Sequence, residues 1–280
     1  MFYLKKICFQ KSQNKIDSQG FISLAQALEK CTKLSSLKIF LYQSKINVQS
    51  AAILGSALIN CNELSNLDIN LNDTQIDGQV IFGLCHSLSQ CAKLQSLDLM
   101  LCEIKISNED VENLGFALSK FPNLITLTLY LQRNQINWKG VSGLMSALAN
   151  CPTLSKLKLD FWGNQFNDYV TQQLGQALQK LSKLKILELN LNKSNIDQDG
   201  LQNLGNALAK CSNLFQLNLE LYFNKIDIEG AQKLCIGLSN CIKLQILKLR
   251  ISNDFLKQQR QLINQKVLKF KRLIAYQLFL

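Results

Sequence analysis

The sequence predicts an α/β solenoid, a row of strand–turn–helix units stacked side by side, because one pattern repeats along all 280 residues. After the first residue of each unit, apolar residues alternate with a period of two and then recur with helical spacing. Such a unit cannot bury both of its apolar faces alone, so we expect the units to stack. The first residue of each unit is a leucine, and the spacing of 30 residues never slips: Leu4, Leu34, Leu64, Leu94, Leu124, Leu154, Leu184, Leu214 and Leu244.

The first part of each unit predicts a short strand with one buried face. Apolar residues follow the leucine three, five and usually seven positions later, as at Leu127, Leu129 and Leu131. Side chains alternate between the two faces of a strand, so the residues in between are expected on the exposed face of the sheet. A polar residue stands ten positions after the leucine in most units: Asn14, Ser44, Thr74, Asn134, Asn164, Ser194 and Asn224.

The second part of each unit predicts an amphipathic helix of about three turns. Leu204, Leu208 and Cys211 stand at i, i+4 and i+7, and the other units repeat this spacing. A small residue lies between the two leucines, which predicts close approach of neighbouring helices. These small residues are Ala27, Ala57, Ser87, Ala117, Ala147, Ala177, Ala207 and Gly237.

The pattern LxxLxLxLxxNxI, followed by GxxxLxxALxxC, resembles the leucine-rich repeat of the ribonuclease-inhibitor type, which has a full helix in each unit. The usual unit reads LxxLxLxxNxL, so this form has two extra strand residues. It is similar to the long repeats of ciliate proteins, and the Gln- and Asn-rich composition agrees. The resemblance covers nearly the whole chain. It implies a horseshoe with a parallel sheet on the concave face and helices on the convex face, and for function only a protein-binding scaffold.

We expect a single domain over residues 1–280, made of nine complete units and a terminal strand at 273–280. Neither end shows an obvious polar cap, and a bare terminal strand exposes unpaired backbone groups. Two interpretations stay open. Short terminal segments fray or fold over the ends, or one end docks on another subunit or belongs to a longer protein.

The formal net charge is +11, from 31 basic and 20 acidic residues, and the C-terminal segment 253–280 carries a large share of it. A basic amphipathic helix there could bind nucleic acid or an anionic membrane surface. The alternative is a last helix with a solvated basic face, and the sequence contains no recognised nucleic-acid module. The basic residues of this segment are Lys257, Arg260, Lys266, Lys269, Lys271 and Arg272.

Most of the ten cysteines occupy one repeat position: Cys31, Cys61, Cys91, Cys151, Cys211 and Cys241. Phe121 and Leu181 replace cysteine in two other units, so the position requires apolar volume and not a thiolate. Neighbouring helices lie roughly 8–10 Å apart, too far for a disulfide bridge. We therefore expect buried free thiols, no metal site and a reducing location such as the cytoplasm, including a cilium or the cytoskeleton.

Positions four, six and eight residues after each leucine are expected on the concave face of the sheet. Exposed aromatic residues are typical anchors of protein interfaces, and nearby carboxylates favour a partner with basic side chains. The alternative is that β-propensity alone places aromatic residues on strands. Charges on this face nearly balance, so we do not expect a phosphate backbone there. The candidate protein-binding residues are Phe40, Tyr42, Met100, Tyr130, Asp160, Trp162, Glu188, Glu220 and Tyr222.

Catalytic signatures are missing from the sequence. It contains no GxGxxG, P-loop, HExxH or GxSxG motif, and His86 is its single histidine. We expect no enzyme, no cofactor and, without an apolar run of 18 residues, no transmembrane segment. The predicted function is a non-catalytic protein-interaction scaffold. Two alternatives are a structural subunit of a ciliary, organellar or ribonucleoprotein assembly that docks through its ends, and an adaptor that binds RNA or anionic lipid through residues 253–280.

Overall fold

The computed structural model describes residues 5–10, 17–42, 44, 46–74, 76–166, 169–251, 255, 257–270 and 272–280. Strands and helices alternate throughout these residues. The strands are β1 (Lys6–Gln10), β2 (Ser36–Phe40), β3 (Asn66–Asn70), β4 (Ser96–Met100), β5 (Thr126–Tyr130), β6 (Lys156–Asp160), β7 (Ile186–Asn190), β8 (Gln216–Glu220), β9 (Ile246–Arg250) and β10 (Ala275–Phe279). The helices are α1 (Ser18–Leu28), α2 (Val48–Ile59), α3 (Gly78–Leu88), α4 (Asn108–Leu118), α5 (Trp138–Leu148), α6 (Tyr169–Leu178), α7 (Gln198–Ala209), α8 (Ile228–Ser239) and α9 (Lys257–Leu268). Leu4, Asn14 and Lys271 lie outside the described residues.

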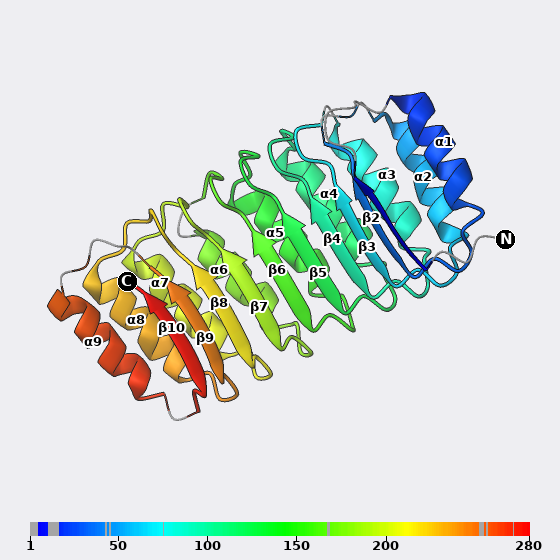
Figure 1. Cartoon of the computed structure of the whole chain (residues 1–280). Helices are drawn as coiled ribbons and strands as arrows, with labels where there is room; N and C mark the ends of the chain where they lie inside the picture. Colours follow the sequence, from blue (N-terminus) through cyan, green and yellow to red (C-terminus); the bar gives the residue numbers. More distant parts are fainter. Residues whose placement is uncertain are drawn as a thin grey trace.

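All the described strands form one parallel sheet in strict chain order, from β1 at one edge to β10 at the other. Leu127 pairs with Leu97 on one side and with Leu157 on the other, so each residue lies beside its repeat equivalents. Figure 1 shows the strands side by side along the molecule, with the helices together behind the sheet. The fold is thus the predicted α/β solenoid of leucine-rich-repeat type.

The core lies between the sheet and the helices. Leu127, Leu129 and Leu131 of one unit are fully buried, and Leu144 and Leu148 of the helix that follows cover them. The predicted alternation of buried and outward-facing strand residues is confirmed in β6, where Leu157 and Leu159 are buried. Each unit thereby buries its strand face against its own helix and its flanks against its neighbours.

The small residues of the helices pack as predicted. Gly115 in α4 lies against α5, where a Cβ atom on it would lie 2.8 Å from the Leu144 Cα atom and 3.2 Å from the Ala147 Cβ atom. Gly175 lies in the same way against Ala207, where a Cβ atom on the glycine would clash with the Ala207 Cβ atom. Neighbouring helix backbones therefore approach more closely than larger side chains would allow.

Two expected boundaries were wrong by a few residues. The strands end six positions after the leading leucine, so Tyr42, Trp162 and Tyr222 lie in the turns beyond them. The chain turns there because the next residue adopts a left-handed backbone in several units, with φ of 71° at Gly163 and 58° at Phe223. The helices also end before the repeated cysteine, since α7 ends at Ala209 and Cys211 lies in the following turn.

The C-terminal edge of the sheet is more exposed than its centre. Ile274 is 77% exposed, and Tyr276 and Phe279 of β10 are 38% and 39% exposed. Beneath this strand, Ile263 and Val267 of α9 are buried, as their helical spacing predicts. Among the described helices, none combines the length and the apolar character that crossing a bilayer requires.

Candidate protein-binding face

The candidate face is the surface of the sheet that points away from the helices. In β6, Lys158 and Asp160 alternate with the buried Leu157 and Leu159 and point outward. In-register pairing places each outward residue beside its equivalents, so Tyr130 pairs with Asp160 and Lys158 with Glu188. A separation of 30 residues in sequence thus corresponds to one strand spacing, about 4.8 Å.

The structure divides the predicted residues into two groups. Met100, Tyr130, Asp160, Glu188 and Glu220 lie on adjoining strands from β4 to β8. Trp162 and Tyr222 join this group from the turns that follow β6 and β8. Phe40 and Tyr42 lie apart at β2, because β3 stands between them and Met100. We call the first group, together with Lys158, the central cluster.

Lys158 connects the central cluster. Its ammonium group donates a hydrogen bond of 2.8 Å to the Tyr130 hydroxyl and lies 4.7 Å from the centroid of the Tyr130 ring. It also lies 3.9 Å from a carboxylate oxygen of Glu188, whose second oxygen pairs with Lys156 at 3.5 Å. Burial lowers the pKa of Lys158, but the hydrogen bond to Tyr130 and the nearby carboxylates together raise it by more. The net shift of the pKa is therefore upward. Lys158 is therefore a fixed cation whose position holds the Tyr130 ring.

Three predicted carboxylates meet at one small pocket. Asp160, Glu188 and Glu220 line a cavity of about 90 Å³, together with Lys158 and Asn218. Glu220 forms an ion pair with Arg250 and accepts a hydrogen bond of 3.3 Å from the Asn192 amide. Glu188 is paired with two lysines, so the protein itself neutralises two of the three carboxylates.

Asp160 differs from the other two carboxylates. It accepts a hydrogen bond of 3.1 Å from the Trp162 backbone N–H, and among the described residues it forms no ion pair. Burial, assisted by the charge of Glu220, raises the pKa of Asp160 above its usual value, although hydrogen bonds from Trp162 and Asn190 oppose the shift. The side chain of Asn218 adds a buried Oδ1 atom with no hydrogen-bond partner. The pocket therefore holds one unneutralised carboxylate and one free acceptor.

Aromatic residues form the rim of the central cluster at the ends of the strands. The Arg133 guanidinium carbon lies 4.5 Å from the Trp162 ring centroid, and Arg133 also pairs with Glu103 at 3.3 Å. Tyr222 packs beside Phe223, with ring centroids 6.4 Å apart. Phe223 is 79% exposed and has a left-handed φ of 58°, an unfavourable conformation for a bulky residue. The left-handed backbone is shared with the same turn position of other units, whereas the exposed aromatic ring is particular to this unit.

A second pair of carboxylates lies on β3 and β4. Asp68 and Asp98 are neighbours in the sheet register, and Lys38 pairs with Asp68 at 3.1 Å. Burial and the charge of Asp68 raise the pKa of Asp98, although a hydrogen bond from Thr128 opposes the shift. Each of the two carboxylates also has a buried Oδ1 atom without a hydrogen-bond partner. This pair lies beside Met100 and extends the polar floor of the face toward β2.

The sequence prediction missed Lys158, Arg133 and Phe223. Lys158 belongs to a predicted outward ladder, and its contact with Tyr130 joins neighbouring strands. Arg133 and Phe223 stand in the turns beyond the strands, where side-chain direction depends on the left-handed backbone. Within the described ranges, no three His, Cys, Asp or Glu residues are placed to hold a metal ion. The groups that do meet are aromatic faces, a fixed cation and a buried carboxylate, which suit molecular recognition.

Comparison with known proteins adds little to this description. No protein-family description and no curated protein matches the sequence. Among solved structures, the chain is similar to internalin C2 from Listeria monocytogenes, with 19% identity and a TM-score of 0.43 over 82% of this chain and 76% of that one. The fold assignment rests on the repeat and the sheet topology of the chain itself.

Proposed function

We propose that this protein is an interaction scaffold that binds a protein partner through the outward face of its sheet, centred on Tyr130, Lys158, Asp160 and Trp162. The observation that carries the proposal is the central cluster itself, where aromatic rings and charged groups are held in place by contacts between strands. Rigid strands lower the entropy cost of presenting such side chains to a partner. Aromatic and arginine side chains also dominate the binding energy of protein interfaces.

The pocket at Asp160 indicates the chemistry of the partner. Its volume of about 90 Å³ accommodates the end of one side chain, and Asp160 is its unneutralised carboxylate. A lysine or arginine of the partner would supply the missing positive charge and donate to the free Oδ1 atom of Asn218. Trp162 and Tyr222 stand in the turns two residues after Asp160 and Glu220, and they would cover the apolar part of that side chain.

Affinity capture from cells of the source organism, followed by titration of the captured partner, tests this proposal. The double variant Tyr130→Ala/Trp162→Ala should weaken binding by roughly a hundredfold, since interface aromatics often contribute 2 kcal/mol or more. Tyr169→Ala is the matched control, because Tyr169 is 61% exposed on α6, on the opposite side of the sheet. Equal affinity of the double variant and the control variant, with unchanged melting temperatures, would place the binding site elsewhere.

The repeat type, the domain bounds and the location in the cell are also proposals. A helix of 10 to 12 residues between successive strands supports the ribonuclease-inhibitor-like long-repeat type, as in ciliate proteins. A single sheet from β1 to β10 supports one domain over residues 1–280. Free cysteines, buried at the repeat position, support a reducing location such as the cytoplasm, including a cilium or the cytoskeleton. The scaffold role itself requires neither catalysis nor a cofactor.

The exposed β10 edge favours a second candidate function, in which the C-terminal end of the solenoid docks. It would dock either in a larger assembly or on an anionic ligand. A cavity of about 440 Å³ lies there between α9 and β10, lined by Lys257, Arg260, Tyr276 and Leu278 among others. The variant Lys257→Glu/Lys269→Glu changes two exposed residues of this segment. If RNA or anionic lipid binds there, this variant should bind single-stranded RNA or phosphatidylserine vesicles more weakly and with less dependence on salt. Unchanged binding of both probes would remove the anion-binding form of this candidate.

A further inference from the structure

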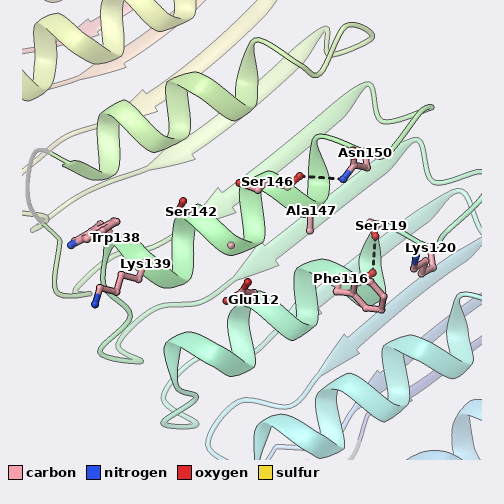
Figure 2. Close-up of a pocket in the computed structure, with 11 residues that line it drawn as sticks. Glu112, Phe116, Ser119, Lys120, Trp138, Lys139, Ser142, Ser146, Ala147 and Asn150 are labelled. Atoms are coloured by element: carbon pink, nitrogen blue, oxygen red, sulfur yellow. Dashed lines mark hydrogen bonds between the residues drawn. The ribbon is translucent and has the colours of Figure 1, made fainter.

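A second distinctive surface lies on the helical side of the molecule, opposite the central cluster. A groove of about 720 Å³ runs between α4 and α5. Figure 2 shows Glu112 and Phe116 of α4 along one wall and Ala147 of α5 along the other, with Ser142 and Ser146 on the side of α5 away from α4. We call this cavity the α4–α5 groove.

The groove results from the sequence of α5 and not from the repeat. Ser142 and Ser146 lie at its far edge, where the Ser142 hydroxyl donates a hydrogen bond of 2.9 Å to the Gln173 side chain of α6, and Gly143 faces α4. Gly143 lies between the two serines, and a Cβ atom there would lie 2.7 Å from the Glu112 Cγ atom. The missing side chain at Gly143 therefore leaves a space beside Glu112, whereas α6 carries Gln173 at the same repeat position.

Phe116 forms the apolar wall of the groove. It is 51% exposed, and the Lys120 ammonium group lies 4.4 Å from its ring centroid. Most other helices carry polar residues at this position: Ser56, His86, Ser146, Gln176 and Asn206, with Ile236 as an apolar case. An exposed aromatic ring beside an open groove is the usual anchor for an apolar side chain of a partner.

The two ends of the groove are positively charged. Figure 2 shows Lys139 beside Trp138 at one end and Lys120 beside Phe116 at the other. The repeat register places Lys120 level with Asn150, which stands one residue beyond the α5 C-cap and eleven residues after Lys139, a separation of about 16 Å at the rise of an α-helix. In the described part of the chain, neither lysine forms an ion pair, and Glu112 between them forms none either. Lysines this far apart cannot converge on one small anion.

We propose that the α4–α5 groove binds an amphipathic helix of about three turns from a protein partner, with two carboxylate side chains eleven residues apart. Eleven residues are close to three full turns, so both carboxylates lie on one face and reach Lys139 and Lys120 together. Small and apolar residues between them would pack on Phe116, Gly143 and Ala147. A second copy of this chain does not fit, because a two-fold contact would bring Lys139 and Lys120 of the two copies together. This site goes beyond the sheet-face scaffold, and the two faces could be occupied at once.

Selection from a displayed peptide library tests the proposal. The probe is a library of 18-residue alanine-based helices with one randomised face, selected on the full chain. Selected peptides should carry Asp or Glu at two positions eleven residues apart. They should bind the groove-filled variant Gly143→Gln roughly tenfold more weakly or worse, because it introduces the residue that α6 carries at this position and fills the space between α4 and α5. The variant Tyr130→Ala is the control, and it should bind the selected peptides with the affinity of the unmodified chain. Because this substitution lies on the sheet face, the control also distinguishes groove binding from sheet-face binding.

Charge reversal supplies the second measurement. Lys120→Glu/Lys139→Glu should lose the selected peptides and gain the matching peptides with lysine at both positions, by roughly tenfold in each direction. Circular dichroism melts should coincide with those of the unmodified chain, because both lysines are exposed. The proposal is overturned if no selected peptide binds the unmodified chain more tightly than the groove-filled variant. It is also overturned if the selected peptides lack the paired carboxylates, or if charge reversal leaves their affinity unchanged.

Discussion

The Asn164 side chain accepts a hydrogen bond of 3.1 Å from the backbone N–H of Asn134, which links two consecutive units of the solenoid. It also accepts from the N–H of Ile136 at 2.9 Å and donates to the Leu131 and Phe161 carbonyls at 2.8 and 2.9 Å. Asn134 repeats the arrangement one unit earlier, accepting from the N–H of Ile104 at 3.0 Å. Both amides are buried, so they satisfy backbone groups that water cannot reach.

Replacing Asn164 should therefore destabilise the whole solenoid. Asn164→Ala leaves four buried backbone groups without these partners, and we expect the free energy of unfolding to fall by about 3 kcal/mol. Asn203→Ala, on the exposed side of α7, is the control and should change it by less than about 0.5 kcal/mol. Urea titration followed by circular dichroism measures both, and equal midpoints for the two variants would contradict the structural role of the asparagines.

Replacement by alanine should change the stability of the protein in opposite directions at two glycines. A Cβ atom on Gly115 would lie 2.8 Å from the Leu144 Cα atom, so Gly115→Ala should push α4 from α5 and lower the stability by about 1–3 kcal/mol. A Cβ atom on Gly83 in α3 would meet nothing within 4 Å, so Gly83→Ala should raise stability by up to about 1 kcal/mol. Thermal melts give the comparison. Stabilisation by both substitutions would mean that α4 and α5 are not closely packed.

The raised pKa of Asp98 predicts a specific dependence of stability on pH. A carboxyl group whose folded pKa is raised contributes stability that is present at low pH and is lost as the pH rises through the folded pKa. Asp98→Asn removes this loss, relieves repulsion from Asp68 and keeps an acceptor for Thr128. The variant should therefore be more stable than the unmodified chain at about pH 7, with the advantage fading toward about pH 3. Urea unfolding at both pH values checks the sign, and a variant that is less stable at neutral pH would refute the explanation.

Thiol reactivity should separate the cysteines by burial. Burial raises the pKa of Cys61 to about 11 and that of Cys85 to about 12, so neither is a thiolate at neutral pH. Cys8 is exposed and should react first with a thiol reagent such as iodoacetamide, followed by the half-buried Cys102. The buried cysteines should react only after denaturation. Mass spectrometry of the native protein identifies the labelled positions, and early labelling of Cys61 or Cys151 would show that the repeat position is not buried.

The repeat made most of the fold predictable. Once Leu127 and Leu129 define a buried strand face, the 30-residue period places every equivalent residue beside it, and parallel pairing follows. The same reasoning correctly placed Tyr130, Asp160 and Glu188 on one outward face. What the period could not supply is the end of each strand, which depends on left-handed turn residues such as Phe223.

The candidate site was less predictable than the fold. Residue type and register identified the carboxylates, but the ion pairs of Glu188 with Lys156 and of Glu220 with Arg250 depend on side-chain direction. These pairs leave Asp160 as the carboxylate of that pocket without an ion pair among the described residues. The α4–α5 groove was missed for a related reason, because it depends on Gly143, where most other units carry a larger residue, and not on the repeat itself.

Site-specific photo-crosslinking tests the central claim, that the sheet face binds a protein partner, most directly. A benzoylphenylalanine residue is placed at Tyr130 or Tyr222 on the sheet face, or at Leu262 as a control on the exposed side of α9. The sheet-face account predicts one adduct of the same partner from positions 130 and 222, and none from position 262. Adducts from position 262 with none from positions 130 and 222 would contradict it.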